Sequence, residues 1–495
     1  MEERGCIPVG LPAPNPLPSY WHIPKSPLAN HIESELPSEC DYVIIGSGIS
    51  GTLIAYGLFC SEPGSRVVIL EAREACGGAT GRNGGHTKAA SYRTYLQHRE
   101  ELGKEEALKI ARLEYENILA THRLAREMKL DCESQECNTV DLIYDQETFE
   151  RGKNAVEILR ADADESESME GGMAWYKVHS RNEAMARFWV DDKNRNPELE
   201  EDEPLAGAFE YAAGRINAYK FATGILETCV KGGLKLFTNT PVETITPAQL
   251  DRSTGSSCHT VSTPKGIILS RSVILATNGY TANLLPAFQG VIVPLRGQIA
   301  AQKPGSAPKF PTPLPTTYSF IYKYGYEYMI PRPLSEGGQH IIIGGGLGRQ
   351  PEGGAGEFGT VNDSELNGSI SRYLRGSLVG YFGKQNWGNE TGERITQEWT
   401  GIMGTTADGI PFVGPMPKTT GLWIAAGFNG HGMVLCLKSA EALVHIIRGG
   451  SVKQLDWFPT SFLINQARLS ESVFHGRTDM KVPETRGESI AQSKL

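Results

Sequence analysis

The stretch 41–71, DYVIIGSGISGTLIAYGLFCSEPGSRVVILE, constrains the fold of this chain more than any other part of the sequence. Its apolar run at 43–45 is typical of a buried parallel strand. The glycines Gly46, Gly48 and Gly51 then supply the pattern G-x-G-x-x-G where this strand must turn into a helix. A second apolar strand follows the helix, so the stretch predicts a nucleotide-binding βαβ unit.

Each glycine of this unit has a separate physical role. Gly46 would allow the tight turn, Gly48 would let the backbone approach a pyrophosphate, and Gly51 would let the helix lie close to the sheet. Glu71 follows Gly51 by about 20 residues, where a carboxylate accepts hydrogen bonds from the adenosine ribose and disfavours a 2′-phosphate. A glycine turn without a ligand is the alternative, and the pattern leaves open which dinucleotide is bound.

Composition agrees with a large enzyme and excludes some partners. With 495 residues, 40% of them hydrophobic and 21% charged, the chain can form two domains or more. The net charge of −9 and the scattered basic residues argue against nucleic acid as a partner. No apolar stretch reaches the ~18 residues of a membrane span, and no signal peptide is recognisable, so we expect an intracellular protein. Nine cysteines without C-x-x-C spacing predict reduced thiols and no metal site.

Three other segments carry structural rather than chemical signals. Residues 1–38 are rich in proline and predict an extended arm that packs on the surface, with dimer contacts as the alternative. Residues 104–128 have apolar side chains at helical spacing and predict an amphipathic helix. The acidic stretches at 161–172 and 196–204 predict solvated loops.

A block of glycines and small residues follows Glu71 directly, and it is too rich in glycine for an ordinary helix. Its position would return the chain to the cofactor, where Arg82 and backbone N–H groups could meet phosphate or flavin edges. A mobile glycine loop is the alternative. The predicted cofactor contacts of this part of the chain are Gly46, Ser47, Gly48, Ile49, Ser50, Gly51, Glu71, Ala72, Arg73, Gly78, Ala79, Thr80, Arg82, Asn83, Gly84 and Gly85.

These motifs, together with GFNGHGM near the C-terminus, resemble the D-amino-acid-oxidase-like superfamily of FAD-dependent oxidoreductases. The superfamily includes glycine, sarcosine and gamma-glutamylputrescine oxidases, and GRNGG at 81–85 most resembles the gamma-glutamylputrescine-oxidase-like branch. The resemblance extends from Asp41 to about Gly450.

The resemblance implies an α/β fold with a glutathione-reductase-like FAD-binding domain of Rossmann type and a second domain with a mixed sheet. The FAD-binding domain is expected at 39–91, 205–285 and 400–450, the substrate domain at 92–204 and 286–399, and a C-terminal tail at 451–495. It implies further FAD contacts, in the order adenine, pyrophosphate and flavin, at Val242, Ala276, Thr277, Gly279, Gly427, Asn429, Gly430, His431, Gly432 and Met433.

The catalytic residues are less clearly indicated. The substrate-domain sheet should roof the flavin, with Arg296, Gln298, Tyr326 and Tyr328 pointing into that space. Arg296 could pair with a substrate carboxylate, although a surface ion pair is an equal alternative. A lysine near the flavin activates oxygen in some relatives, and Lys303 or Lys309 loosely corresponds to it.

His431 is expected to contact flavin or substrate, with a histidine that is hydrogen-bonded to nearby backbone as the alternative. The flavin is expected to be non-covalent, with attachment through His86 as the alternative. No Ser-His-Asp array and no metal cluster is recognisable.

The resemblance implies oxidation of a C–N bond in a small amine or amino acid. Hydride would pass from the carbon beside a neutral amine to flavin N5, giving an imine, and the electrons would pass to O2 and give H2O2. An FAD-dependent dehydrogenase, a tailoring enzyme of secondary metabolism and a non-enzymatic FAD-bound scaffold are the alternatives. The sequence ends in S-K-L at 493–495, which predicts recognition by the peroxisomal import receptor.

Overall fold

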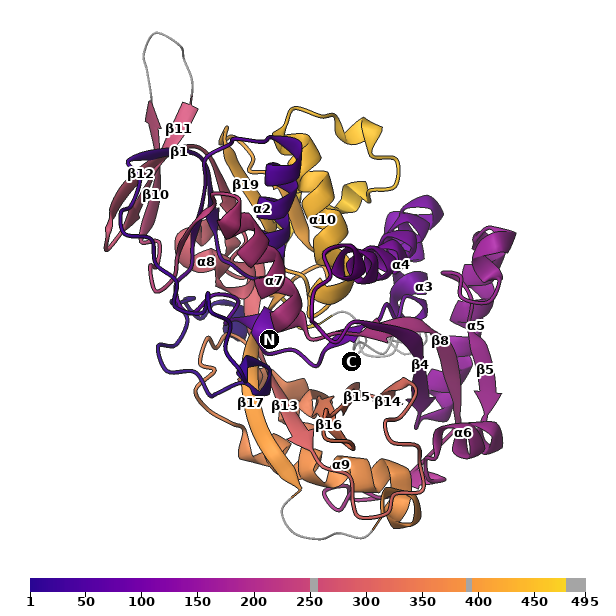
Figure 1. Ribbon diagram of the computed structural model, residues 1–495. Coiled ribbons are helices and arrows are strands. Elements are labelled where there is room, and N and C mark those ends of the chain that lie inside the picture. The colour runs from indigo at the N-terminus through magenta and orange to yellow at the C-terminus, as the bar shows by residue number, and fades with distance from the viewer. Residues whose placement is uncertain (250–256, 389–393, 478–495) are drawn as a thin grey trace, which may run out of the picture.

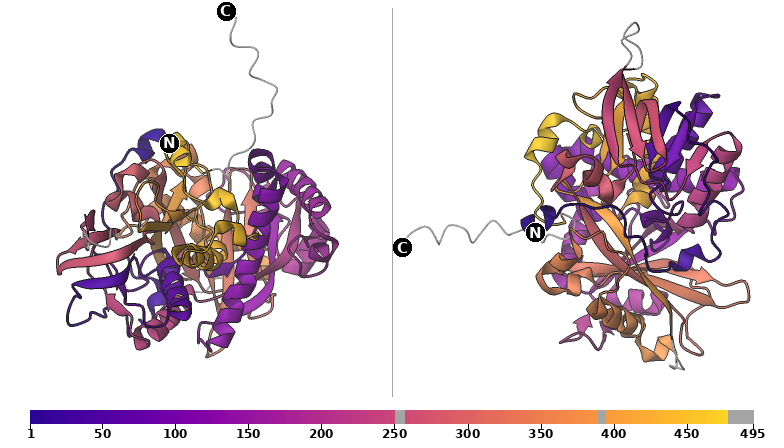
Figure 2. Two further views of the ribbon diagram at one scale, coloured as in Figure 1. Left: turned by 90° about the horizontal axis from the view of Figure 1, so that it is seen from above. Right: turned by 90° about the vertical axis from the view of Figure 1, so that its left-hand side faces the viewer.

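The computed structural model describes residues 1–249, 257–388 and 394–477 (Figure 1). Two β-sheets form its framework. In the right-hand view of Figure 2, strands of the first sheet (pink) lie at the top and those of the second (orange) at the bottom. A parallel Rossmann-type sheet and a separate mixed sheet confirm the predicted fold class.

The first sheet has a parallel centre. β1 (Glu39–Ile45) lies between β12 (Gly266–Leu275) and β2 (Val67–Leu70), and β2 continues to β9 (Lys235–Phe237). The remaining strands are β10 (Thr244–Gln249) and β11 (Ser257–Thr263), which are antiparallel, β19 (Leu422–Ala426), which is parallel to β12, and β18 (Phe412–Pro415), which is antiparallel to β19.

The centre of this sheet is buried on both faces. Val43 and Ile44 point to opposite faces of β1, and both are fully buried. Three helices lie together beside the sheet, namely α2 (Ile49–Ser61), α7 (Ala218–Lys231) and α10 (Gly432–Ile447) (Figure 1). Asn217 is the N-cap of α7, and its side chain accepts a hydrogen bond from the Lys220 N–H. The apolar run of β1 therefore forms the buried parallel strand that its composition predicts.

The second sheet is mixed and larger. Its strands follow the order β17 (Ile395–Thr406), β13 (Ile292–Gln302), β16 (Gln339–Gly344), β15 (Gly325–Pro333), β14 (Thr317–Tyr322), β4 (Gln135–Ile143), β8 (Gly207–Arg215) and β3 (His86–Thr87), with β5 (Lys177–Ser180) beside β8. Only the β14–β4 pair of this order is parallel. Helix α9 (Gly368–Trp387) packs against the second sheet. Tyr373 and Tyr381 of this helix donate hydrogen bonds to the fully buried Glu327 of β15.

The division of the chain between the two sheets differs from the predicted domain segments. Strands β3, β8 and most of β17 fall in segments assigned to the FAD-binding domain, but all three pair within the second sheet. The reason is long-range pairing: β8 lies along the whole length of β4, which no local pattern specifies. The chain therefore crosses between the layers at several points.

The helices beside the second sheet account for the intervening sequence. Helix α4 (Lys104–Glu127) matches the predicted amphipathic helix, and the segment 161–172 contains the end of α5 (Gln146–Asp162) and a short turn. The other helices are α1 (Glu2–Gly5), α3 (Tyr92–Leu102), α6 (Arg181–Phe188), α8 (Thr281–Leu284) and α11 (Gln466–Glu471). None of the helices in the described residues is long and apolar enough to span a membrane.

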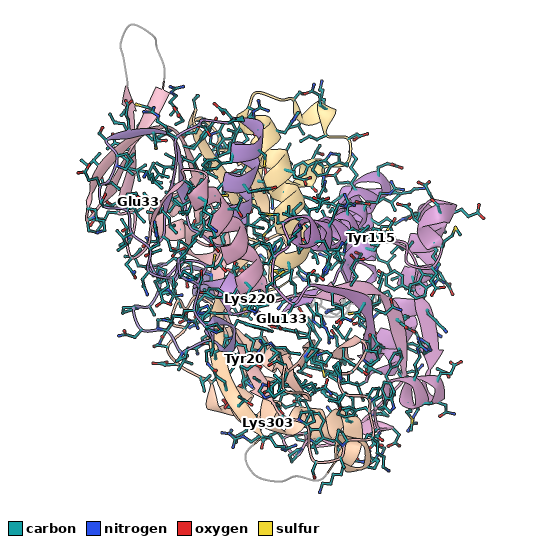
Figure 3. All side chains as sticks on the ribbon, viewed as in Figure 1. Tyr20, Glu33, Tyr115, Glu133, Lys220 and Lys303 are labelled. Carbon is teal, nitrogen blue, oxygen red and sulfur yellow. The ribbon has the colours of Figure 1, made fainter. Side chains whose placement is uncertain are left out.

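The N-terminal arm, residues 1–38, has many exposed residues, but one short turn of it is buried. Tyr20, Trp21 and His22 form a 3-10 turn and are all buried (Figure 3 labels Tyr20). Burial of these rings between the two layers removes more apolar area from water than surface packing would. The arm is therefore anchored at this turn, which its proline content did not predict.

Candidate functional site

A cavity of about 320 Å³ lies between the two sheets and is lined by residues from both. Its volume is within the range of small-molecule sites, roughly 300–1,000 Å³. One end is formed by the turn between β1 and α2, and the other by strands of the second sheet. We call these the dinucleotide end and the roof end.

The glycine turn at the dinucleotide end has no room for side chains. Gly46 adopts φ +102°, and a Cβ there would lie 2.7 Å from the Ala276 carbonyl oxygen. A Cβ on Gly51 would lie 2.0 Å from the Gly46 carbonyl oxygen, so glycine is required for the helix to lie against the strand. Gly48 is the N-cap of α2 and has no side-chain cap. The first turn of α2 therefore begins at the cavity wall with its backbone exposed to a ligand.

The carboxylate of Glu71 is held in place at the end of β2. Its Oε2 accepts hydrogen bonds from the Ser47 N–H at 2.9 Å and the Ser47 hydroxyl at 2.7 Å, and its Oε1 accepts one from the Arg73 N–H at 3.0 Å. A carboxylate has about four acceptor positions, so Oε1 retains one. Glu71 lines the cavity, where this position can accept a hydrogen bond from a ligand hydroxyl.

The block after Glu71 wraps around this end of the cavity. Thr80 lines it, and the Thr80 hydroxyl oxygen accepts a hydrogen bond from the Ile49 N–H at 2.9 Å. Arg73 pairs with the fully buried Asp363 through two hydrogen bonds of 2.8 and 2.9 Å. Arg82 donates to the carbonyl oxygens of Gly77 and Thr400, each at 2.9 Å. These bonds fix the glycine-rich block in one conformation, in contrast to a mobile loop.

At the roof end, Arg296 is already paired. Its Nε donates to Glu357 Oε2 at 2.6 Å, and its Nη1 donates to the Asn362 carbonyl oxygen at 3.2 Å. The side chain of Gln298 is similarly engaged, because it donates to the Ser371 hydroxyl and accepts from the Asn367 N–H. Both residues line the cavity, but these polar contacts hold the loop before α9.

Lys88 is a cavity residue that the sequence analysis missed. Its ammonium group forms a buried ion pair with Asp141 and donates to the Ser319 hydroxyl at 2.5 Å. The fully buried Asp141 also accepts hydrogen bonds from the hydroxyls of Tyr92 at 2.9 Å and Tyr211 at 3.0 Å. Burial lowers the pKa of Lys88 and the Asp141 charge opposes that effect. The only available signal was its position directly after the glycine-rich block.

Two arginines meet at Tyr326 on the same side of the cavity. The Arg93 guanidinium lies 4.2 Å from the ring centroid, and Arg477 donates to the Tyr326 hydroxyl at 3.0 Å. Both arginines and His431 also line a smaller side pocket that contains Glu114. Burial raises the pKa of Glu114 to about 7, opposed by a hydrogen bond from the Ser91 hydroxyl.

Comparison with known proteins decides the family. The model of the FAD dependent oxidoreductase family, abbreviated DAO, matches residues 41–446. The chain belongs to this family. Its cofactor is accordingly FAD.

The relatives of this FAD-dependent oxidoreductase are distant in sequence. The probable oxidoreductase OrdL of Haemophilus influenzae is 24% identical over 53% of this chain and 56% of its own length. The match thus spans little more than half of that relative. The gamma-glutamylputrescine oxidoreductase of Escherichia coli is 21% identical over 90% of each chain. The crystal structure of glycine oxidase from Geobacillus kaustophilus has a TM-score of 0.63 at 20% identity, over 87% of this chain and 99% of that one, which shows a shared fold.

The dinucleotide end fits FAD. A Cβ at Gly48 would lie 3.2 Å from the Thr80 hydroxyl, in the space that a pyrophosphate needs above the N-terminus of α2. Glu71 presents its remaining acceptor position to a ribose. FAD would therefore be held by the turn 46–51, Glu71 and the block 72–85, with the flavin towards the roof end.

Most of the predicted site residues line this one cavity. They are Gly46, Gly48, Ile49, Ser50, Glu71, Ala72, Arg73, Gly78, Ala79, Thr80, Arg82, Asn83, Gly84, Gly85, Val242, Ala276, Thr277, Arg296, Tyr328, Gly430, His431, Gly432 and Met433.

Six predicted residues are absent from the lining of the cavity. Ser47 turns its hydroxyl to Glu71, Gly51 packs on Gly46, and a Cβ on Gly279 would lie 2.5 Å from the Met403 carbonyl oxygen. The other three are Gly427, Asn429 and Lys303. Lys303 is exposed beyond the end of β13, in the lower part of Figure 3. This corrects its assignment to the flavin, because β13 carries it away from the cavity.

Two cavity residues bear on how FAD is attached. Burial keeps the pKa of Cys436 raised to about 12, so this cavity-lining residue is a thiol, and its sulfur accepts a hydrogen bond from Ser50. His86 lines the cavity, and its buried Nε2 has no hydrogen-bond partner among the described residues. His86 therefore remains the candidate if a covalent bond exists. No group of His, Cys, Asp and Glu side chains within 1–249, 257–388 and 394–477 could hold a metal ion.

Proposed function

We propose that this protein is an oxidase that acts on the C–N bond of a carboxylated amine or amino acid and uses O2 as the acceptor, with H2O2 as the product. Bound FAD would supply the two-electron oxidation. The names of the E. coli relative and the Geobacillus structure, a gamma-glutamylputrescine oxidoreductase and a glycine oxidase, support an amine or amino acid.

One observation carries the substrate class: the charged side chains that line the cavity are mostly basic. Six arginine and lysine side chains line it against one carboxylate, that of Glu71. The carboxylates Asp363, Asp141 and Glu357 pair with several of the basic groups but stand behind the wall, because none of them lines the cavity. The cavity surface therefore favours an anionic ligand, both the FAD pyrophosphate and a substrate carboxylate.

The same charges favour the reactive form of the amine. A nearby positive charge disfavours an ammonium group and lowers its pKa. Lys88 and Arg93 therefore favour a bound amine without its proton, the form whose neighbouring carbon can release hydride. We expect activity to rise with pH through an alkaline limb.

Lys88 replaces Lys303 as the candidate for handling the acceptor. It is the lysine that lines the cavity within the described ranges, and Asp141 and Ser319 fix its ammonium group. A fixed cation beside the flavin would stabilise negative charge that develops on oxygen.

The test is peroxide release by the purified holoenzyme across matched pairs of amines with and without a carboxylate. We expect one H2O2 per O2 consumed and a preference for the carboxylated member of each pair. Substrate that bleaches the flavin without O2, followed by no reoxidation in air, would identify a dehydrogenase instead. Lack of bleaching by every amine would overturn the substrate class. FAD-free Gly48→Asp protein serves as the blank.

The peroxisomal address remains a prediction. Residues 493–495 lie outside the described residues, and the relatives named above come from bacteria. Import of a fluorescent fusion that ends in residues 478–495, against one that lacks the last three, would test it.

A further inference from the structure

We infer that the N-terminal arm is a wall of the FAD site and governs how tightly the adenosine half of FAD is held. In Figure 1 the arm (indigo) runs beside both layers of the molecule. The inference depends on FAD binding and not on the oxidase reaction.

The arm holds the part of the glycine-rich block at 78–85, which we call the cofactor loop, on the side away from the cavity. The Trp21 Nε1–H donates to the Asn83 carbonyl oxygen at 2.6 Å, and the Ser19 hydroxyl donates to the Gly81 carbonyl oxygen at 2.6 Å. The His22 ring packs so closely on this loop that a Cβ at Gly81 would lie 2.2 Å from His22 Nε2. The residues that flank Gly81, Thr80 and Arg82, both line the cavity. The conformation of the loop therefore depends on the arm.

The arm also binds the second sheet. The Tyr20 hydroxyl lies 2.7 Å from His340 Nδ1 and accepts a hydrogen bond from Arg332 at 2.8 Å. The Tyr20 ring stacks on Trp399 of β17 with 6.0 Å between centroids. The turn at Tyr20–His22 thus contacts both the cofactor loop and the second sheet. It therefore sets the spacing between the two sides of the cavity.

Further towards the N-terminus, the arm reaches the cavity itself. Leu11 and Pro12 line it, and the Ala13 carbonyl oxygen accepts a hydrogen bond from Arg73 Nη1 at 2.9 Å. Arg73 lies two residues beyond Glu71, and Leu11 and Pro12 line the same cavity as Glu71. We therefore assign Leu11 and Pro12 to the adenosine half of the site. Leu11 is 47% exposed. An apolar side chain left open beside the ribose carboxylate would be covered when an adenosine group binds.

The test compares Leu11→Ala and Trp21→Phe with Ile23→Ala, a control in the same segment with a side chain that is 66% exposed. Apoprotein would be titrated with FAD, ADP and FMN by fluorescence, and the Tm of each apoprotein recorded. We expect Leu11→Ala to weaken FAD and ADP by similar factors of about five- to ten-fold, since both place adenosine against this wall. FMN binding should not change, and Ile23→Ala should resemble wild type. Trp21→Phe should weaken FAD binding in the same titration, because it removes the hydrogen bond to the Asn83 carbonyl oxygen.

Unchanged FAD and ADP affinities in Leu11→Ala and Trp21→Phe would overturn the inference, whatever happens to the Tm. Unchanged affinities together with a lowered apoprotein Tm would show that the arm stabilises the fold but does not affect FAD binding. Equal weakening of ADP and FMN would also contradict it, because the arm would then not act on the adenosine half. Loss of peroxide production with normal FAD affinity would instead concern the proposed reaction.

Discussion

The two ends of the cavity are built from different kinds of surface. At the dinucleotide end the turn 46–51 presents backbone to the cavity, and this turn and Glu71 come from one short stretch of chain. At the roof end the wall consists of side chains such as Lys88, Tyr328 and Arg477, which come from separate elements and from the segment after α11. The central turn of the first end is therefore set by local sequence, although the distant N-terminal arm supports it, whereas the second end is assembled by tertiary contacts.

This difference predicts how each end responds to change. A backbone wall cannot accept a new side chain without a collision, as the Cβ positions at Gly46 and Gly51 show. A side-chain wall can be altered in charge or shape while the fold remains. We therefore expect substitutions in the turn at the dinucleotide end to abolish cofactor binding. Substitutions at the roof end should instead change the turnover rate or the choice of substrate.

The largest effect is expected from Gly48→Asp. Its Cβ would lie 3.2 Å from the Thr80 hydroxyl, and its carboxylate would occupy the position of the pyrophosphate and repel it. The purified variant should lack flavin absorption. The matched control is Gly356→Asp, where a Cβ meets nothing within 4 Å. A yellow Gly48→Asp protein would mean that the turn does not hold the cofactor.

At the roof end, Lys88→Met should destabilise the protein by about 3 to 5 kcal/mol, because it leaves the charge of Asp141 buried without its partner. The double variant Lys88→Met/Asp141→Asn should recover most of that loss in a urea denaturation. Tyr92 and Tyr211 can still donate to the amide oxygen of the new side chain. Equal stability of the single and double variants would show that the pair is not coupled.

Acid should lower the stability of the fold near both ends of the cavity, because each end is supported by a buried histidine that is neutral in the folded state. Burial lowers the pKa of His22, behind the cofactor loop, and of His122, hydrogen-bonded to Thr87, to about 4. A folded-state pKa below the unfolded value means that stability is complete above pH ~6.5 and is lost as pH falls towards 4. The loss should be on the order of 2 to 3 kcal/mol for each. In Tm against pH, His122→Gln should flatten this limb, and the exposed His475→Gln should not.

The smallest effect is expected from Arg296→Met. Its guanidinium is bound to Glu357 and the Asn362 carbonyl, so its loss should change kcat/KM for carboxylated and uncharged amines by the same small factor. A selective loss of kcat/KM for carboxylated substrates would show that the Arg296 guanidinium breaks its ion pair with Glu357 and binds the substrate carboxylate. Glu357→Gln provides the control for the pairing.

The sequence could predict the dinucleotide end because its determinants are local. The spacing of Gly46, Gly48 and Gly51 and the position of Glu71 follow from a strand, a turn and a helix in succession. The fold class followed from the same stretch and from the resemblance to a known family.

The roof end could not be predicted in the same way. Lys88 is held at the cavity by its ion pair with Asp141, which lies on strand β4 of the second sheet. Lys303 does not reach the cavity, because it follows the end of β13 and is exposed to solvent. Proline content indicated an extended arm, but not that Tyr20 and Trp21 would be buried between the layers. These outcomes depend on which strands pair and which surfaces meet, and a linear pattern does not contain that information.

The separation of the two ends is tested most directly by the flavin spectrum of Lys88→Met/Asp141→Asn before and after anaerobic mixing with a carboxylated amine that bleaches the wild-type flavin. We predict full flavin content, because the turn 46–51 and Glu71 are intact, and bleaching at least about ten-fold slower than in wild type. A colourless variant, or bleaching at the wild-type rate, would contradict this separation.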